Sequence, residues 1–454
     1  MSHLKNLIHD LDQLKLDCEY WDVRIEDSFE TAIDMVDGEA VTYTSSPSLG
    51  AFLRVRKNGF WIYESTTNIS KIKESLVSLA KQNPPPQSPH KYIATQQAPF
   101  IKVSYQATKF SAVSLDTKYN LTKKYYDVLK ENKLTGSTNI RYRDIYKVKS
   151  FLNSVGTQFE FDFNQGGINL GYTLKDQSNN IFDDRVYFYG SEFKQLENHE
   201  SLVRQGQKES EMFLTAPAVT PGKYNVLLDP EVTGVFTHES FGHKSEADFM
   251  LGDPQALKDW KLGAKIASEL LTIVDDGTHE FTSGYCPIDD DGTRAQKNYL
   301  IKNGVLTGRL HTVDTAIQLD EKPTGNSRAM NFEFEPMVRM TSTYIEAGTE
   351  SLASIMKRSE GALLVEGVKH GSGLSTFTIA PTRGYQIGKD GAKFPVRLSV
   401  ISGSVFETLK NIDAVSADFH LMSSAIGGCG KMGQWPLSVA DGGPYVLVKE
   451  MQVS

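Results

Sequence analysis

Alternating apolar and polar residues in the first half of the chain predict strands interrupted by a few helices. Strand-like alternation covers residues 21–67 and 137–190, and helical spacing covers residues 69–82, 114–132 and 191–213. The clearest local signal is the stretch LRVRKNGFWIYE, in which Asn58 and Gly59 supply the positive φ angles of a tight hairpin turn. This half of the chain is therefore expected to be a mixed sheet-and-helix domain.

The pattern changes after a break at residues 216–223. The segment YNVLLDPEVTGVFTHESFGHKSEADFM then runs from a buried strand into a helix, with Asp229 as the N-cap and Pro230 at the first helical position. Short apolar runs separated by Gly- and Asp-rich turns follow, and such punctuation is typical of antiparallel strands. We predict an α+β fold, with a mixed α/β domain at 1–220 and a largely antiparallel β domain at 221–454 that carries the helix.

Length and charge limit the classes of protein to which this chain can belong. A chain of 454 residues is too long for one ordinary core, and its net charge of −8 argues against a nucleic-acid surface. No apolar run approaches the roughly 18 residues that span a bilayer, and the N-terminus lacks the pattern of a signal peptide. The three scattered cysteines, Cys18, Cys286 and Cys429, form no disulfide framework. These features predict a cytoplasmic protein without membrane or direct nucleic-acid partners.

The strongest chemical signal is His238-Glu239-Ser240-Phe241-Gly242-His243. Two imidazoles and a carboxylate at the start of a helix are the parts of a hydrolytic zinc site. On a regular α-helix, residues five positions apart point about 140° from each other, so both histidines cannot face one ion. A wider π-type turn would bring them together, and Gly242 tolerates such a distortion. We therefore predict a deformed helical turn at 238–243.

Two nitrogen ligands are too few for a stable site, so a third ligand is needed. Cys429 lies in the glycine-rich stretch 427–431, which is expected to be a loop that can approach a metal closely. A small buried hydrophobe is the ordinary alternative for this cysteine. Glu246, three residues after His243, is the rival third ligand. The residue pattern leaves both candidates open.

A wider set of motifs resembles the TldD side of the TldD/PmbA family. His238–His243, with Glu246 and Asp248 following, resembles its HExxxH signature. Further family-like motifs occur in family order over about 200 residues: Val274–Thr278, Asp290–Thr293, Pro323–Asn326, Pro336–Thr341 and Gly428–Gln434. One departure is Lys244-Ser245 and Ala247, where the family often has Gly-Leu and Gly. This departure leaves the metal motif intact and concerns substrate contacts and partner choice.

The resemblance implies a zinc-dependent metallopeptidase that hydrolyses unfolded or small peptides in the cytosol. It implies Zn²⁺ on His238, His243 and Cys429, with Glu239 as the catalytic acid/base. It also implies a dimer, either of two copies or with a PmbA-like subunit that lacks the zinc motif. The competing function is a non-catalytic peptide-binding or regulatory subunit of the gyrase-modulator kind. Glu239 favours catalysis, because a purely structural site needs no carboxylate beside its first histidine.

Other polar residues are weaker candidates. The aspartates at 275–276 and 289–291 could bind a cation, but aspartates before glycine more often form Asx-turns. His311 and His370 could lie near the cleft as oxyanion donors, although a solvated loop is the commoner place for a histidine. Asn326 and Arg328 are candidates for shaping the site or binding a peptide carboxylate.

Overall fold

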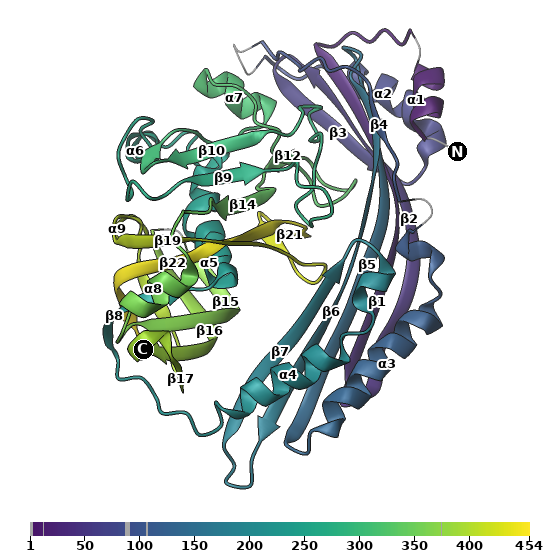
Figure 1. Cartoon of the computed structure of the whole chain (residues 1–454). Helices are drawn as coiled ribbons and strands as arrows, with labels where there is room; N and C mark the ends of the chain where they lie inside the picture. Colours follow the sequence, from purple (N-terminus) through teal and green to yellow (C-terminus); the bar gives the residue numbers. More distant parts are fainter. Residues whose placement is uncertain (1–2, 12, 87–90, 106–107, 374) are drawn as a thin grey trace.

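The computed structural model describes residues 3–11, 13–86, 91–105, 108–373 and 375–454. Two sheets dominate it, one built from the first half of the chain and one from the second (Figure 1). Helices pack on both, and the strand pairs are largely antiparallel. The α+β fold predicted from the sequence is therefore confirmed.

The first sheet has the strand order β3-β2-β1-β5-β6-β4, and β7 also pairs with β6. Its strands are β1 (Tyr20–Val36), β2 (Glu39–Lys57), β3 (Phe60–Thr66), β4 (Phe100–Lys102), β5 (Thr135–Asn153), β6 (Gln158–Lys175) and β7 (Ile181–Gly190). Asn58 and Gly59 join β2 to β3 with φ angles of 54° and 81°, which confirms the predicted hairpin. Long neighbouring strands give this sheet one continuous face toward the second half.

Helices cover the other face of this sheet. They are α1 (His3–Leu11), α2 (Ile72–Lys81) and α3 (Leu115–Glu131), and Figure 1 shows all three on the side away from the second half. α2 and α3 lie within the two helical segments predicted at 69–82 and 114–132. The apolar side of α3 buries Tyr125 and Leu129 against strand residues such as Ile140. α4 (Glu200–Glu211) follows β7 and falls inside the third predicted helical segment.

The second sheet has the order β11-β10-β9-β14-β22-β18-β16-β15-β8, with β17 beside β16 and β19 beside β22. Its strands are β8 (Gly222–Leu228), β9 (Ile273–Asp276), β10 (Lys297–Lys302), β11 (Val305–Leu306), β14 (Ser342–Ile345), β15 (Leu363–Gly373), β16 (Thr376–Ile387), β17 (Lys393–Val396), β18 (Ile401–Ser404), β19 (Ile412–Ser423) and β22 (Ala440–Val453). Because β22 also pairs with β8, the strands β8, β15, β16, β18 and β22 form a closed ring.

Shorter elements complete this half of the molecule. The small strand pairs are β12 (Ser327–Arg328) with β13 (Met337–Val338), and β20 (Cys429–Lys431) with β21 (Gln434–Leu437). The helices are α5 (Pro230–Thr237), α6 (Pro254–Asp259), α7 (Val313–Leu319), α8 (Leu352–Arg358) and α9 (Val405–Lys410). In Figure 1 the β20–β21 hairpin extends toward β5 and β6.

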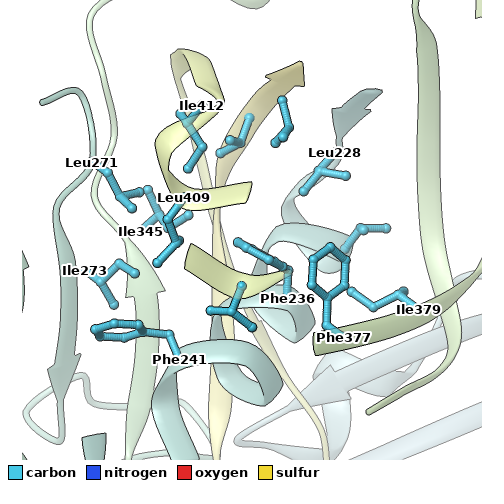
Figure 2. Close-up of a cluster of buried hydrophobic side chains, with 14 of the residues drawn as sticks. Leu228, Phe236, Phe241, Leu271, Ile273, Ile345, Phe377, Ile379, Leu409 and Ile412 are labelled. Atoms are coloured by element: carbon cyan, nitrogen blue, oxygen red, sulfur yellow. The ribbon is translucent and has the colours of Figure 1, made fainter. Parts of the chain in front are cut away.

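Helix α5 is fixed at its start and along its length. The Asp229 carboxylate accepts a hydrogen bond from the Val232 N–H at 2.8 Å, and Pro230 occupies the first turn, as predicted. Phe236, near the end of α5, is fully buried against Phe377, and Phe241 is buried in the turn that follows (Figure 2). These two rings flank His238, so the turn that carries the histidines is anchored in the core.

The connection between the two halves runs from the end of α4 to β8. Every strand of the first sheet precedes residue 191, and every strand of the second sheet follows residue 221. We propose that this connection divides the chain into domains 1–220 and 221–454.

Candidate metal centre

The helix widens directly after α5. Residues His238–Gly242 form a π-helical turn, in which the His243 N–H donates to the His238 carbonyl five residues earlier. The deformed turn predicted at 238–243 is thereby confirmed. The centroids of the His238 and His243 rings lie 5.0 Å apart with an interplanar angle of 88°. The wider turn thus brings together two side chains that a regular α-helix would hold apart.

Glycine at 242 has a packing reason as well as a conformational one. A Cβ added there would lie 2.0 Å from the Met340 Sδ, and Met340 is fully buried. The turn can therefore lie close to the β13–β14 segment only because residue 242 has no side chain. This contact fixes the depth at which the two imidazoles sit.

Cys429 approaches the histidines from 186 residues further along the chain. Its Sγ lies 3.5 Å from the His243 Nε2, and the three candidate ligand atoms of His238, His243 and Cys429 all lie within 4.8 Å of one another. Tetrahedral zinc with ordinary Zn–S and Zn–N bonds places sulfur and nitrogen ligands about 3.6 Å apart. The observed spacing therefore fits one zinc ion.

The stretch around Cys429 differs from the expected loop. Cys429 begins the short strand β20, pairs with Leu437 and is buried. Gly428 makes this possible, because a Cβ at its φ of 156° would lie 2.4 Å from the Leu437 carbonyl oxygen. The glycines thus allow a tight hairpin that presents the thiol, where an open loop was predicted.

Glu246 lies behind His243. Its Oε2 is 3.1 Å from the His243 Nδ1 and 3.1 Å from the Lys431 Nζ, so it sits on the ring nitrogen that does not face Cys429. Lys431 also donates to the Asp248 carboxylate at 2.7 and 2.8 Å and to the Val338 carbonyl. A carboxylate on the second nitrogen of a histidine orients the ring for metal binding. The structure places Glu246 as support for His243, and away from the third-ligand position.

Charges at the site favour an ionised thiol. Burial raises the pKa of Cys429, but the facing His238 and His243 imidazoles outweigh burial and lower this pKa to about 5. Burial lowers the pKa of His243, yet hydrogen bonds to Cys429 and Glu246 raise it to about 10. The His238 Nδ1 is buried without a hydrogen-bond partner among the described residues. Without a metal, the cluster is a thiolate beside a protonated imidazole, and a cation would take the place of the proton.

Glu239 is half-buried beside strand β15. A Cβ added at Gly371 would lie 3.7 Å from the Glu239 Cγ, at ordinary contact distance, so the Glu239 side chain lies next to that strand. Within the described part of the chain, the Glu239 carboxylate makes no hydrogen bond or ion pair. Its oxygens are therefore available to accept a proton.

Asp441, at the start of β22, is a further acidic group near the centre. Burial raises the pKa of Asp441 to about 6; the neighbouring His238 opposes the rise, and Glu231 and Glu239 add to it. Nothing in the sequence marks this residue, since an aspartate before two glycines is typical of a turn. Only the packing of α5 against β22 brings it near the histidines.

Most of the remaining candidates make contacts that hold the structure together. Asp275 accepts hydrogen bonds from Asn326, Thr341 and Thr343, and Asp289 accepts from backbone N–H groups in its own turn, as an Asx-turn would. Asp290 and Asp291 form buried ion pairs with arginines of the first sheet. His311 contacts Glu321 and Thr315, and His370 is exposed on β15. Within the described residues, none of them joins the His-His-Cys group.

Two histidines and a cysteine that converge in this way could hold one metal ion, and three protein ligands are the number found in catalytic zinc sites. The model for the PmbA/TldA metallopeptidase C-terminal domain matches residues 221–454, and the model for domain 1 of that family matches residues 21–83. A metalloprotease of Synechocystis sp. is 31% identical over 96% of this chain and 94% of its own length.

Two other proteins extend the comparison. A zinc metalloprotease TldD homolog of Saccharolobus solfataricus is 35% identical over 51% of this chain and 52% of its own. The crystal structure of TldE from Thermococcus kodakarensis shares the fold, with a TM-score of 0.78 over 100% of both chains at 17% identity. The chain belongs to the PmbA/TldD metallopeptidase family.

Among the described residues, no helix is both long enough and apolar enough to cross a membrane.

Proposed function

We propose that this protein is a zinc-dependent peptidase, with the metal bound by His238, His243 and Cys429. The single observation that carries the proposal is the convergence of these three ligand atoms within 4.8 Å across 186 residues of sequence. When bound, zinc supplies Lewis acidity at an open fourth position. The ligand set agrees with the naming of a relative as a zinc metalloprotease.

The chain's own residues carry the proton transfers. Glu239 follows His238 directly, and its unpaired carboxylate accepts the proton of the attacking water and returns it to the leaving amine. Glu246 holds the His243 ring, and Lys431 holds Glu246. Of the three carboxylates Glu239, Glu246 and Asp248, only Glu239 has no ion pair within the described structure.

The proposal includes the partners. The substrate is an unfolded or small peptide, because His238 and Cys429 are buried and a folded protein could not reach them. We propose that the chain works as a dimer, with a second copy or with a PmbA-like subunit, and the likeness of its fold to TldE supports such a pairing. In this proposal, the subunit that binds the metal is the catalytic subunit of the dimer.

Replacing Glu239 with glutamine tests the catalytic assignment. Glu239→Gln keeps the shape of the side chain but cannot accept the proton, so hydrolysis of an unstructured peptide should fall by about 10²-fold or more. Zinc content, measured by elemental mass spectrometry, should stay near one per chain in both proteins. Peptide products are followed by mass spectrometry.

A matched control is Glu360→Gln, which changes an exposed glutamate with no ion pair in the described structure. The control should cleave as the parent does. Equal cleavage by Glu239→Gln and the parent would remove Glu239 from catalysis. A parent that binds zinc and hydrolyses no peptide would instead favour the regulatory alternative.

A further inference from the structure

The first sheet and the second half of the molecule enclose two adjoining pockets. One, of about 620 Å³, lies against β5 and β6, and the other, of about 460 Å³, lies against β6 and β7; Ile426 lines both. The Ala425 N–H donates to the Tyr187 hydroxyl at 2.7 Å, and the Gln165 amide donates to the Ser438 hydroxyl at 3.0 Å. These bonds tie the segment around Ile426 to the sheet. Both volumes lie in the usual range for ligand sites.

The larger pocket is mainly cationic, and we call it the basic pocket. It is lined by two carboxylates, Glu30 and Asp144, and by five cations: Arg141, Arg143, Lys147, Lys149 and Arg328. Four of the cations alternate along β5, so they share the sheet face that looks toward the second half. The sequence pattern of β5 thus creates a basic stripe in the cleft.

Ion pairs neutralise part of this stripe. Carboxylates at Asp34, Glu26 and Asp290 pair with three of the cations, Arg143, Lys147 and Lys149 respectively. Arg141 is exposed and Arg328 is buried, and within the described structure neither faces a carboxylate partner. Arg328 donates only to the carbonyls of Met340 and Ser438. Two guanidinium groups in this pocket therefore lack a counter-charge.

The smaller pocket has the opposite charge, and we call it the acidic pocket. It is lined by two cations, Arg185 and Arg383, and by five carboxylates: Asp184, Asp229, Glu231, Glu366 and Asp441. Three of the carboxylates are paired: Asp184 with Arg383, Glu231 with Arg185, and Glu366 with Lys393. Asp441 has no cationic side chain bonded to it in the described structure, whereas Asp229 accepts hydrogen bonds from the Val232 and Gly367 N–H groups, and burial raises its pKa to about 8.

Both pockets are lined by residues that lie close to the candidate metal ligands. Gly427 lines the basic pocket two residues before Cys429. Asp441 lines the acidic pocket and interacts electrostatically with His238 and Glu239. Val235, one helical turn before Glu239, also lines the acidic pocket, and residues four apart share a helix face. Residues next to the metal ligands therefore line both pockets, whose unpaired side chains have opposite charge.

We propose that the cleft orients its peptide by charge, with the C-terminal carboxylate or acidic side chains in the basic pocket and the N-terminal ammonium in the acidic pocket. Arg141 and Arg328 recognise the carboxylate end, and Asp441 recognises the ammonium end. The inference rests on the proposed peptidase function and specifies its substrate class as short peptides with free termini. A peptide bound in this way supplies the counter-charges that the protein itself does not provide.

Binding rather than cleavage tests the orientation. The zinc-loaded Glu239→Gln protein is titrated calorimetrically with a neutral, unstructured hexapeptide in four forms: free, N-acetylated, C-amidated, and blocked at both ends. Each single block should weaken binding about tenfold, because each removes one charge-assisted contact. Adding Arg141→Gln should reduce the effect of C-amidation, because only Arg328 then remains at the carboxylate end, and it should preserve the effect of N-acetylation. Adding Asp441→Asn should abolish the effect of N-acetylation and preserve the effect of C-amidation.

Arg397→Gln is the matched control for Arg141→Gln, because Arg397 is also exposed and without an ion pair in the described structure, yet lies outside both pockets. In the Arg397→Gln variant, N-acetylation and C-amidation of the peptide should each still weaken binding about tenfold. Equal affinity for all four peptides, or a reversed pairing of variant and blocked end, overturns the proposal. This experiment measures binding and not turnover, so its result is independent of the proposed peptidase activity. The charge preference can be confirmed even if the parent protein hydrolyses no peptide, and it can be contradicted even if the parent is an active peptidase.

Discussion

At the residue scale, the charge of Cys429 links the geometry of the centre to metal binding. Its thiol meets two imidazoles in a buried site, and those imidazoles bring its pKa to about 5 despite burial. The other cysteines lack such partners: burial raises the pKa of Cys18 and brings that of Cys286 to about 11. A thiolate is the form that binds zinc, so only one of the three cysteines is prepared for this role.

This difference predicts one selective titration. In metal-free protein, thiolate absorbance near 240 nm should rise by the equivalent of one cysteine with a midpoint near pH 5, while the other two stay protonated through neutral pH. Zinc affinity should fall as the pH drops through this midpoint, because protons then compete for the sulfur. Cys429→Ser should lose the absorbance step and bind zinc more weakly, whereas Cys286→Ser should keep both. An unchanged titration in Cys429→Ser would contradict the assignment.

Individual residues were predictable from the sequence only where a motif marked them. His238, Glu239 and His243 are contiguous, and Cys429 stands in a family-like glycine motif, so all four could be proposed before the fold was known. The residue pattern left both Cys429 and Glu246 open as the third ligand, and only the packing shows that Glu246 lies on the far nitrogen of His243. Asp441 carried no signal, since its relation to the histidines depends on how α5 meets β22.

At the element scale, α5 and strand β22 determine where the histidine turn lies. Gly234, in the middle of α5, faces the backbone of β22 so closely that an added Cβ would lie 2.4 Å from the Gly442 nitrogen and 2.7 Å from the Asp441 Oδ1. Gly442 has a φ of 156° and a similarly close neighbour, the His420 carbonyl oxygen. The backbone of β22 at Gly442 is thus packed between α5 on one side and β19 on the other and cannot easily move. Gly234 and Gly442 together therefore set the position of α5.

Gly234→Ala should therefore destabilise the protein although alanine favours helix. The steric cost of overpacking, about 1–3 kcal/mol, exceeds the roughly 1 kcal/mol that alanine contributes to an exposed helix. Because α5 continues directly into the His238 turn, zinc affinity should fall as well. Urea unfolding and zinc titration measure the two effects. Gly136→Ala, whose Cβ would meet its nearest atom at 3.5 Å, is the control, and equal behaviour of the two variants would contradict this account.

The sequence predicted elements best where local spacing alone determines geometry. Helical arithmetic showed that histidines at positions i and i+5 diverge, which led directly to the π-type turn. Asn58-Gly59 likewise identified its hairpin. The closed ring of β8, β15, β16, β18 and β22 was not predictable, because it joins strands more than 200 residues apart through pairings that no local pattern specifies.

At the scale of the whole molecule, buried ion pairs join the two sheets. Asp290, in a turn of the second half, lies 2.8 Å from the Arg24 Nη1 and 2.7 Å from the Lys149 Nζ of the first sheet. Beside it, Asp291 pairs with Arg54 at 2.5 Å. Burial alone would raise the pKa of Asp290, but the Arg24 and Lys149 charges hold it well below its ordinary value. This interface also fixes the sheet face that forms the floor of both pockets.

Asp290→Asn tests how much this interface contributes. The substitution leaves the buried Arg24 and the mostly covered Lys149 short of a counter-charge, and breaking a buried pair on one side typically costs about 3–5 kcal/mol. The lowered pKa means that the Asp290 contribution is fully present above the unfolded-state value of about 3.9 and is lost only as the pH falls below it. The stability difference from the parent, measured by urea unfolding, should thus be constant from pH 5 to 8 and shrink in stronger acid. Asp320→Asn, at an exposed left-handed position that asparagine tolerates, should change stability little. A parent no more stable than Asp290→Asn at pH 7 would mean that apolar contacts alone hold the two sheets together, and the cleft between them would then be free to open.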